Sequence, residues 1–88
     1  MTKLGVCSTF IIGQASTETV ADTLTSAGID GACLVNAEGL WQGNLEVCVL
    51  AKVDGLTFER ALELAGLLRE RFKQECILLE HGGEAFLV

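Results

Sequence analysis

The sequence predicts one domain of the α+β class, and three observations support this prediction. Segments 17–27 and 58–74 carry apolar residues at helical spacing, each next to a Ser or Thr that can cap a helix. Segment 45–53 alternates between two sets of side chains, as a strand with one buried face does. The chain has 88 residues, which suits one domain near the small end of what folds without disulfides or metals.

The first strand is expected at 6–12, where the run VCSTFII is closed by a glycine. The first helix is expected at 17–27, because Ser16 or Thr17 can accept a hydrogen bond from a free N–H of its first turn. Gly28 predicts a left-handed residue that ends this helix.

The second strand is expected at 32–36, and it runs into AEGLWQGN, whose glycines and asparagine predict a loop or an irregular hairpin. In the third strand, 45–53, every second residue is predicted to face the core: Leu45, Val47, Val49, Ala51 and Val53. Cys48 and Leu50 make the middle of the opposite face apolar as well. This indicates that the opposite face is also partly covered.

The second helix is expected at 58–74, with Thr57 as its N-cap. Its buried stripe is predicted to contain Phe58, Ala61, Leu62, Ala65, Leu68 and Phe72, widened by Leu64 and Leu67. Gly66 interrupts this helix at a cost of about 1 kcal/mol relative to alanine, which indicates close backbone packing there.

The chain ends in two strand-like runs, CILLE and EAFLV, separated by His-Gly-Gly. These three residues are typical of a hairpin loop with a glycine in the left-handed region. The only histidine, His81, lies near Glu80 and Glu84, so a metal or acid–base site is the alternative. An exposed loop tip supplies neither the further ligands nor the pocket that such sites need, and we therefore favour a plain turn.

The element order β-α-β-β-α-β predicts a ferredoxin-like sandwich, with an antiparallel sheet, two helices on one face and a C-terminal β-hairpin. Half of the residues are hydrophobic, a large share for so small a domain. Segments 76–79 and 85–88 are apolar on both sides of their strands. Since two helices cover one face only, we expect a second copy to cover the other and form a homodimer.

Charge and cysteine content argue against several classes of function. The net charge of −6 opposes binding to nucleic acid or to an anionic membrane, and no apolar run is long enough to span a bilayer. The four cysteines form no C-x-x-C pair, so a structural zinc site is not expected. They lie in apolar runs with no signal peptide before them, which predicts buried, reduced thiols in a cytoplasmic protein.

No motif for a nucleophile or a phosphate-binding loop is present, so no catalytic residue, metal or cofactor is expected. Trp41, the only tryptophan, is either a core residue or a partly exposed anchor for a partner. The candidates for an interaction surface are Trp41, Cys48, Leu50 and Phe86. The candidates for a ligand cleft between subunits are Trp41, His81 and Glu84.

The segment RFKQECILL, 71–79, together with Trp41, resembles small uncharacterised α+β families encoded by bacteria and phages. The resemblance covers about a quarter of the chain and implies a ferredoxin-like domain. Such families have no established catalytic residues, so the resemblance implies no site in this chain.

Three functions follow as hypotheses. The first is a non-enzymatic interaction module that self-associates through its sheet. The second is an acidic, anti-CRISPR-like inhibitor from a phage or mobile element, which would bind a host protein through Glu46, Glu63 or Glu70. The third is a small-ligand-binding or enzymatic dimer with a cleft between subunits, an analogy from fold alone.

Overall fold

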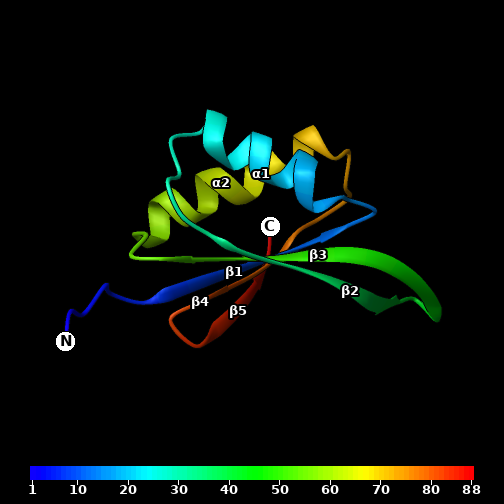
Figure 1. The fold of residues 1–88 in the computed structure, drawn as a ribbon. Helices are drawn as coiled ribbons and strands as arrows, with labels where there is room; N and C mark the ends of the chain where they lie inside the picture. The colour runs from blue at the N-terminus through cyan, green and yellow to red at the C-terminus, as the bar shows by residue number, and fades with distance from the viewer.

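A computed structural model describes all residues, 1–88, and confirms the α+β class. The elements in chain order are β1 (Cys7–Gly13), α1 (Thr17–Ser26), β2 (Cys33–Trp41), β3 (Asn44–Asp54), α2 (Phe58–Arg71), β4 (Leu78–His81) and β5 (Glu84–Leu87). Figure 1 shows both helices on the same face of a single sheet. The other face carries no helix.

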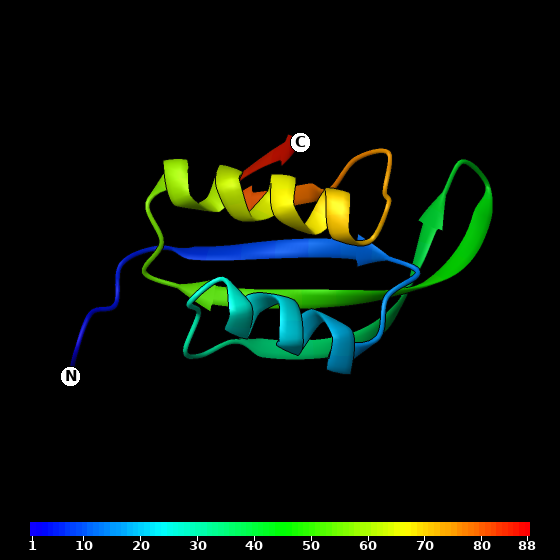
Figure 2. The ribbon, with the colours of Figure 1, turned by 90° about the horizontal axis from the view of Figure 1, so that it is seen from above.

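The sheet has five strands in the order β2-β3-β1-β4-β5, and every neighbouring pair is antiparallel. The central strand, β1, pairs with β3 on one side and β4 on the other. Seen from above in Figure 2, α1 lies over the β2–β3 side and α2 over the β1–β4 side. The fifth strand, β5, follows the six elements of the ferredoxin-like order and pairs with β4, where the sequence predicts a C-terminal hairpin.

Both helices begin where the sequence predicts. The backbone N–H of Thr19 donates to Ser16 Oγ at 3.2 Å, and that of Arg60 donates to Thr57 Oγ1 at 3.1 Å. The predicted end of the second helix, residue 74, is too late. Lys73 lies in the left-handed region at φ +53°, and Gln74 N–H donates back to Arg69 C=O, which closes the helix as a glycine usually does.

The core lies between the helices and the sheet. Phe10 and Ile12 of β1 are fully buried there with Val49 and Ala51 of β3. In α2 the buried residues are Ala61, Leu64, Ala65 and Leu68. Leu62, predicted as core, is 37% exposed because it lies beside the buried stripe.

Of the two structures predicted for AEGLWQGN, the loop is wrong and the hairpin is closer, because β2 continues through Trp41 and pairs with β3. Gln42 and Gly43 form the turn to β3, with φ of +50° and +80°, and two successive left-handed residues suit a tight hairpin. The hairpin projects past the helices (Figure 2). Leu45 and Val47, predicted as core, are therefore 71% and 65% exposed on its helix-side surface.

The C-terminal strands β4 and β5 pair antiparallel, with His81 opposite Glu84. Only Gly82 and Gly83 connect them, at φ +59° and +88°. The predicted three-residue loop is wrong in one respect, since His81 belongs to the strand. Neither α1 nor α2 combines the length and the apolar character that a membrane-crossing helix needs.

Candidate ligand-binding pocket

A pocket of about 490 Å³ lies on the sheet face that the helices leave open. Its position follows from the alternation of β1. Phe10 and Ile12 face the core, so Ile11 and Gly13 face the opposite way and line the pocket. The volume falls within the range of small-molecule sites, about 300–1,000 Å³.

Several further parts of the chain supply the walls, among them β4 with Leu78 and β5 with Leu87. Gly39, Leu40 and Trp41 come from β2, Glu46 and Cys48 come from β3, and the connection between α2 and β4 contributes Lys73 to Cys76. Trp41 is 45% exposed, so one part of its indole is free to meet a ligand. The sequence left open whether Trp41 is core or anchor, and the structure places it at the pocket surface.

The polar centre of the pocket lies over Gly13. A Cβ at this position would lie 2.6 Å from Glu46 Oε1 and 2.9 Å from Gln74 Oε1. The two oxygens therefore occupy space that any other residue at position 13 would fill. Glycine in a strand often marks such a close approach.

Neither oxygen has a partner within the molecule. The one ion pair of the protein joins Arg60 to Glu63, so no basic side chain neutralises Glu46. Gln74 Nε2 donates to the Phe72 carbonyl at 3.3 Å, which turns Oε1 of the same amide toward Gly13. The pocket thus presents two acceptors that no donor of the protein engages, although Lys73 also lines it.

Cys48 lies beside this centre and is only 4% exposed. Burial, and to a smaller extent the negative charge of Glu46, raises the pKa of the Cys48 thiol above its usual value. The thiol is therefore neutral at physiological pH and a poor nucleophile. The contribution of Glu46 to this rise in pKa indicates that its negative charge lies close enough to influence the Cys48 thiol in the pocket wall.

Two pocket residues other than glycine have left-handed backbone conformations, Gln14 at φ +53° and Lys73 at φ +53°. Such conformations cost about 1 kcal/mol or more and gather at functional sites. They flank the opening from β1 and from the end of α2.

The predicted interaction residues divide between the two faces of the sheet. Cys48 and Trp41 line the pocket, and Leu50 lies on the same open face. Phe86 does not. It pairs with the buried Leu79, and its ring lies 5.0 Å from that of Phe58 in α2, so it faces the helices.

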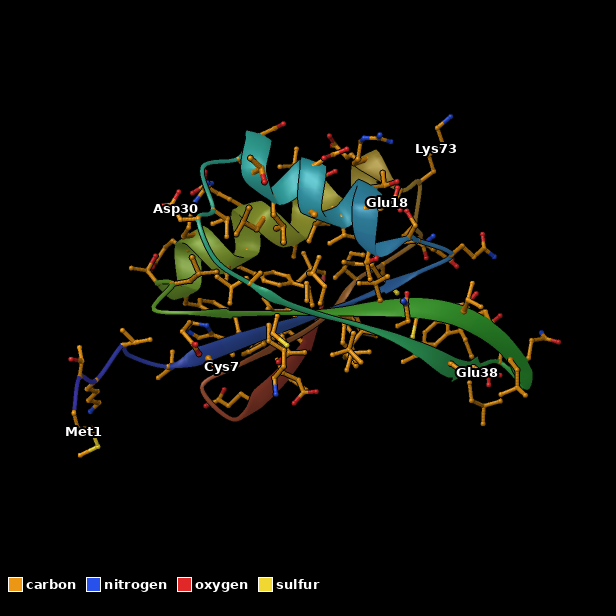
Figure 3. All side chains as sticks on the ribbon, viewed as in Figure 1. Met1, Cys7, Glu18, Asp30, Glu38 and Lys73 are labelled. Atoms are coloured by element: carbon orange, nitrogen blue, oxygen red, sulfur yellow. The ribbon has the colours of Figure 1, made fainter.

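Within one chain, Trp41 does not lie beside His81 and Glu84, so the predicted cleft of these three residues could form only between subunits and stays a prediction. His81 pairs with Ser8 near the start of β1, while Trp41 lies by the pocket near Gly13 at its end. Figure 3 shows the separation of the two ends, with Cys7 at one and Glu38 of the β2–β3 hairpin at the other. His81 is half-buried rather than exposed at a tip.

The cysteine prediction is correct for Cys48 only. Cys76 is half-buried in the pocket wall, and Cys7 and Cys33 are exposed. All four are free thiols. No three side chains among His, Cys, Asp and Glu are placed to hold a metal ion together.

Sequence reasoning missed Gly13, Gln74 and Gly39 as site residues, and it named Glu46 only as a surface charge. The usable signal was glycine inside strands. Gly13 is the last residue of β1, Gly39 lies within β2, and both line the pocket. Gln74 gives no such signal, because its role depends on where α2 ends.

Among solved structures, a phage SAM lyase in its apo state resembles this chain over its whole length. The two are 25% identical in sequence with a TM-score of 0.72, and the match covers 100% of this chain and 94% of the lyase chain. No protein-family model matches the sequence, and no curated protein does. The chain is therefore similar throughout its fold to a small phage enzyme, which counts against a purely non-enzymatic interpretation.

Proposed function

We propose that this protein is a lyase that binds S-adenosylmethionine (SAM) in the pocket of the open sheet face. The observation that carries the proposal is a pocket of about 490 Å³ with a half-exposed tryptophan, in a chain that resembles a phage SAM lyase from end to end. The proposal takes up the earlier alternative of a small-ligand-binding or enzymatic protein and moves its site to the pocket.

The pocket has surfaces suited to a nucleoside. A flat adenine can stack on the exposed part of Trp41, since base–aromatic stacking contributes about 1–3 kcal/mol. Ile11, Leu78 and Leu87 offer an apolar surface for the rest of the molecule. Enclosure between these walls would hold a flexible ligand in one conformation, which is a large part of what an intramolecular cleavage needs.

The chemistry does not require the catalytic motifs that the sequence lacks. When a carbon–sulfur bond of a sulfonium breaks, the bonding electrons go to sulfur and a neutral thioether leaves, while the carboxylate of the same SAM molecule forms the new bond to that carbon and closes a lactone. Such a leaving group needs no proton from a general acid. A pocket without a histidine or a nucleophilic serine is therefore compatible with this reaction.

The test is incubation of the purified protein with SAM, followed by liquid chromatography. We expect SAM to disappear and a new adenine-containing product to form without any second substrate. Trp41→Ala should lower kcat/KM by at least about tenfold, because the stacking surface is lost. Leu62→Ala, on the exposed side of α2, is the control. Unchanged SAM after long incubation with folded protein would refute the proposal.

We also propose that the chain self-associates through the open face of its sheet, in a ferredoxin-like arrangement. The strand order β2-β3-β1-β4 supports that arrangement. Val35 of this face is 42% exposed and Leu50 is partly exposed beside it, and neither lines the pocket. Apolar surface of this kind on a small protein usually marks an interface.

Light scattering during gel filtration tests the self-association. We expect a dimer or a larger assembly at micromolar concentration, and its dissociation in Val35→Lys, which puts a charge on the face outside the pocket. Arg60→Gln, on the helix side, should leave the mass unchanged. A monomer at every concentration would refute this proposal.

The phage-encoded inhibitor is a second candidate function, supported by the net charge of −6 and by the phage origin of the similar lyase. In that case the partner is a host protein in the cytoplasm. Glu63→Gln with Glu70→Gln, on the exposed side of α2, should weaken such binding. Capture that persists in this variant would contradict an electrostatic role for α2.

A further inference from the structure

We propose that Glu46 Oε1 and Gln74 Oε1, held together over Gly13, form a subsite for a positively charged centre of the ligand. The inference rests on the proposed function for the identity of the ligand, and it names the part of the pocket that selects the ligand's charge. Glu46 and Gln74 are then specificity-determining residues, and Gly13 is a positioning residue.

The first argument is convergence. The two oxygens lie within 3 Å of one point, the position of a Cβ at residue 13. They come from β3 and from the segment after α2, which are far apart in sequence, so the pairing is a product of the fold. Gly13 makes it possible, because no side chain competes for the space.

The second argument is the absence of a donor. A carboxylate oxygen and an amide oxygen both accept hydrogen bonds and cannot bond to each other. Gln74 has its donor atom, Nε2, occupied by the Phe72 carbonyl. No buried side-chain oxygen of the protein lacks a partner, so both acceptors are reached by solvent. A positive group of the ligand can replace that water and bind both oxygens at once.

The third argument is electrostatic. Glu46 is half-buried, lacks an ion-pair partner, and raises the pKa of the neighbouring Cys48 thiol in addition to the effect of burial. Its field therefore extends across the pocket wall. A charge held in such a partly desolvated place interacts more strongly than one at the open surface.

SAM offers two positive centres, the sulfonium and the primary ammonium. Either would fit two convergent oxygens, since a sulfonium attracts them electrostatically and an ammonium donates hydrogen bonds to them. The shared chemistry is a cation adjoining an adenosyl group. Ligands that differ in one charge at a time distinguish binding of the sulfonium from binding of the ammonium.

The experiment measures dissociation constants by quenching of the single tryptophan, Trp41, which lines the same pocket. One pair of ligands is SAM and S-adenosylhomocysteine, which differ by the sulfonium charge and one methyl group. A second pair is 5′-dimethylsulfonioadenosine and methylthioadenosine. Both lack the amino-acid part, and they too differ by the sulfonium charge and one methyl group. A third pair is S-adenosylhomocysteine and its N-acetyl derivative, which lacks the ammonium charge.

Glu46→Gln is the decisive variant, because it removes the charge and keeps the shape. Gln74→Leu removes the second oxygen. Glu38→Gln is the matched control, since it changes net charge equally and lies exposed on β2 opposite Val47, outside the pocket wall. Thermal unfolding of each variant confirms that it is folded before binding is compared.

We expect wild-type protein and Glu38→Gln to prefer the charged ligand at least about tenfold in the first two pairs if the sulfonium is bound, or in the third if the ammonium is bound. Glu46→Gln should abolish the preference, and Gln74→Leu should reduce it. Equal affinity within every pair, or an unchanged preference in Glu46→Gln, would overturn the subsite. Wild-type protein that binds none of the five ligands would overturn it as well.

Turnover of SAM, measured separately, distinguishes this inference from the proposed function. A charge preference that depends on Glu46 without any turnover would leave the subsite in place and remove the lyase activity. Turnover of SAM with no charge preference would support the lyase activity and refute the subsite.

Discussion

The two ends of the central strand β1 carry the two polar clusters of this sheet, and they differ in how their hydrogen bonds are satisfied. At the start, Ser8 is fully buried and its hydroxyl lies 2.8 Å from His81 Nδ1. The His81 ring also packs at 5.5 Å from Phe58. At the other end, Glu46 and Gln74 meet over Gly13 without a donor.

The difference shows that a polar cluster which satisfies itself contributes to stability, whereas one with unmatched acceptors is available for a ligand. The sequence drew attention to the first cluster because histidine is a common catalytic residue. The structure favours the second. Three predictions test this comparison, from the largest expected effect to the smallest.

Replacing His81 should lower stability and leave the pocket unchanged. His81→Ala removes the hydrogen-bond partner of a fully buried hydroxyl and the ring that packs on Phe58. We expect a loss of about 2–3 kcal/mol in the free energy of unfolding by urea, with ligand affinity unaltered.

The double variant with Ser8→Ala should recover part of that loss, because no buried hydroxyl is left without a partner. Strictly additive effects would mean that the Ser8–His81 hydrogen bond contributes nothing measurable. Lost ligand affinity in His81→Ala, with the fold retained, would mean that the two ends are not independent.

Replacing Gly13 should have the opposite outcome. In Gly13→Ala the new methyl group displaces the flexible ends of Glu46 and Gln74, and alanine is preferred to glycine in a strand by about 0.5–1 kcal/mol. We therefore expect stability within about 1 kcal/mol of wild type and a clear loss of affinity for the charged ligands. Wild-type affinity in this variant would contradict the role of the convergent oxygens.

Thiol labelling should give the smallest but most local effect. Because burial and Glu46 raise the pKa of Cys48, this thiol should react with iodoacetamide at least about tenfold more slowly than the exposed Cys33. Because its pKa is raised, Cys48 should begin to label faster only when the pH exceeds the usual thiol pKa. Mass spectrometry after proteolysis distinguishes the sites.

In Glu46→Gln the pKa of Cys48 should fall toward its usual value, and labelling should accelerate slightly, because burial remains the larger cause. Labelling of Cys48 as fast as that of Cys33 in the wild-type protein would contradict its placement beneath the pocket wall.

Local chemistry made much of the fold predictable. Ser16 and Thr57 cap the helices as expected, and the alternation of β3 buries Val49, Ala51 and Val53. The prediction failed where a residue's environment depends on distant elements. The alternation continues through Val47, but no helix reaches that far along the hairpin, so this side chain stays 65% exposed.

The pocket was less predictable for the same reason. Trp41 was identified by its rarity, but its neighbours in the pocket come from β1, β3, β4, β5 and the connection between α2 and β4. Gln74 becomes a pocket residue only because Lys73 adopts a left-handed conformation and ends α2 early. A sequence without aligned relatives gives no signal for that event.

The two-residue turn at Gln42–Gly43 has a consequence for how chains of this kind can vary in length. Gly39 and Trp41 precede the turn, Glu46 and Cys48 follow it, and the pairing of β2 with β3 sets all four on one face. Strand side chains alternate with a period of two, so a single-residue insertion that shifts the register would invert one wall. Insertions or deletions at this turn that preserve the pocket should therefore occur in symmetric pairs, one residue on each strand.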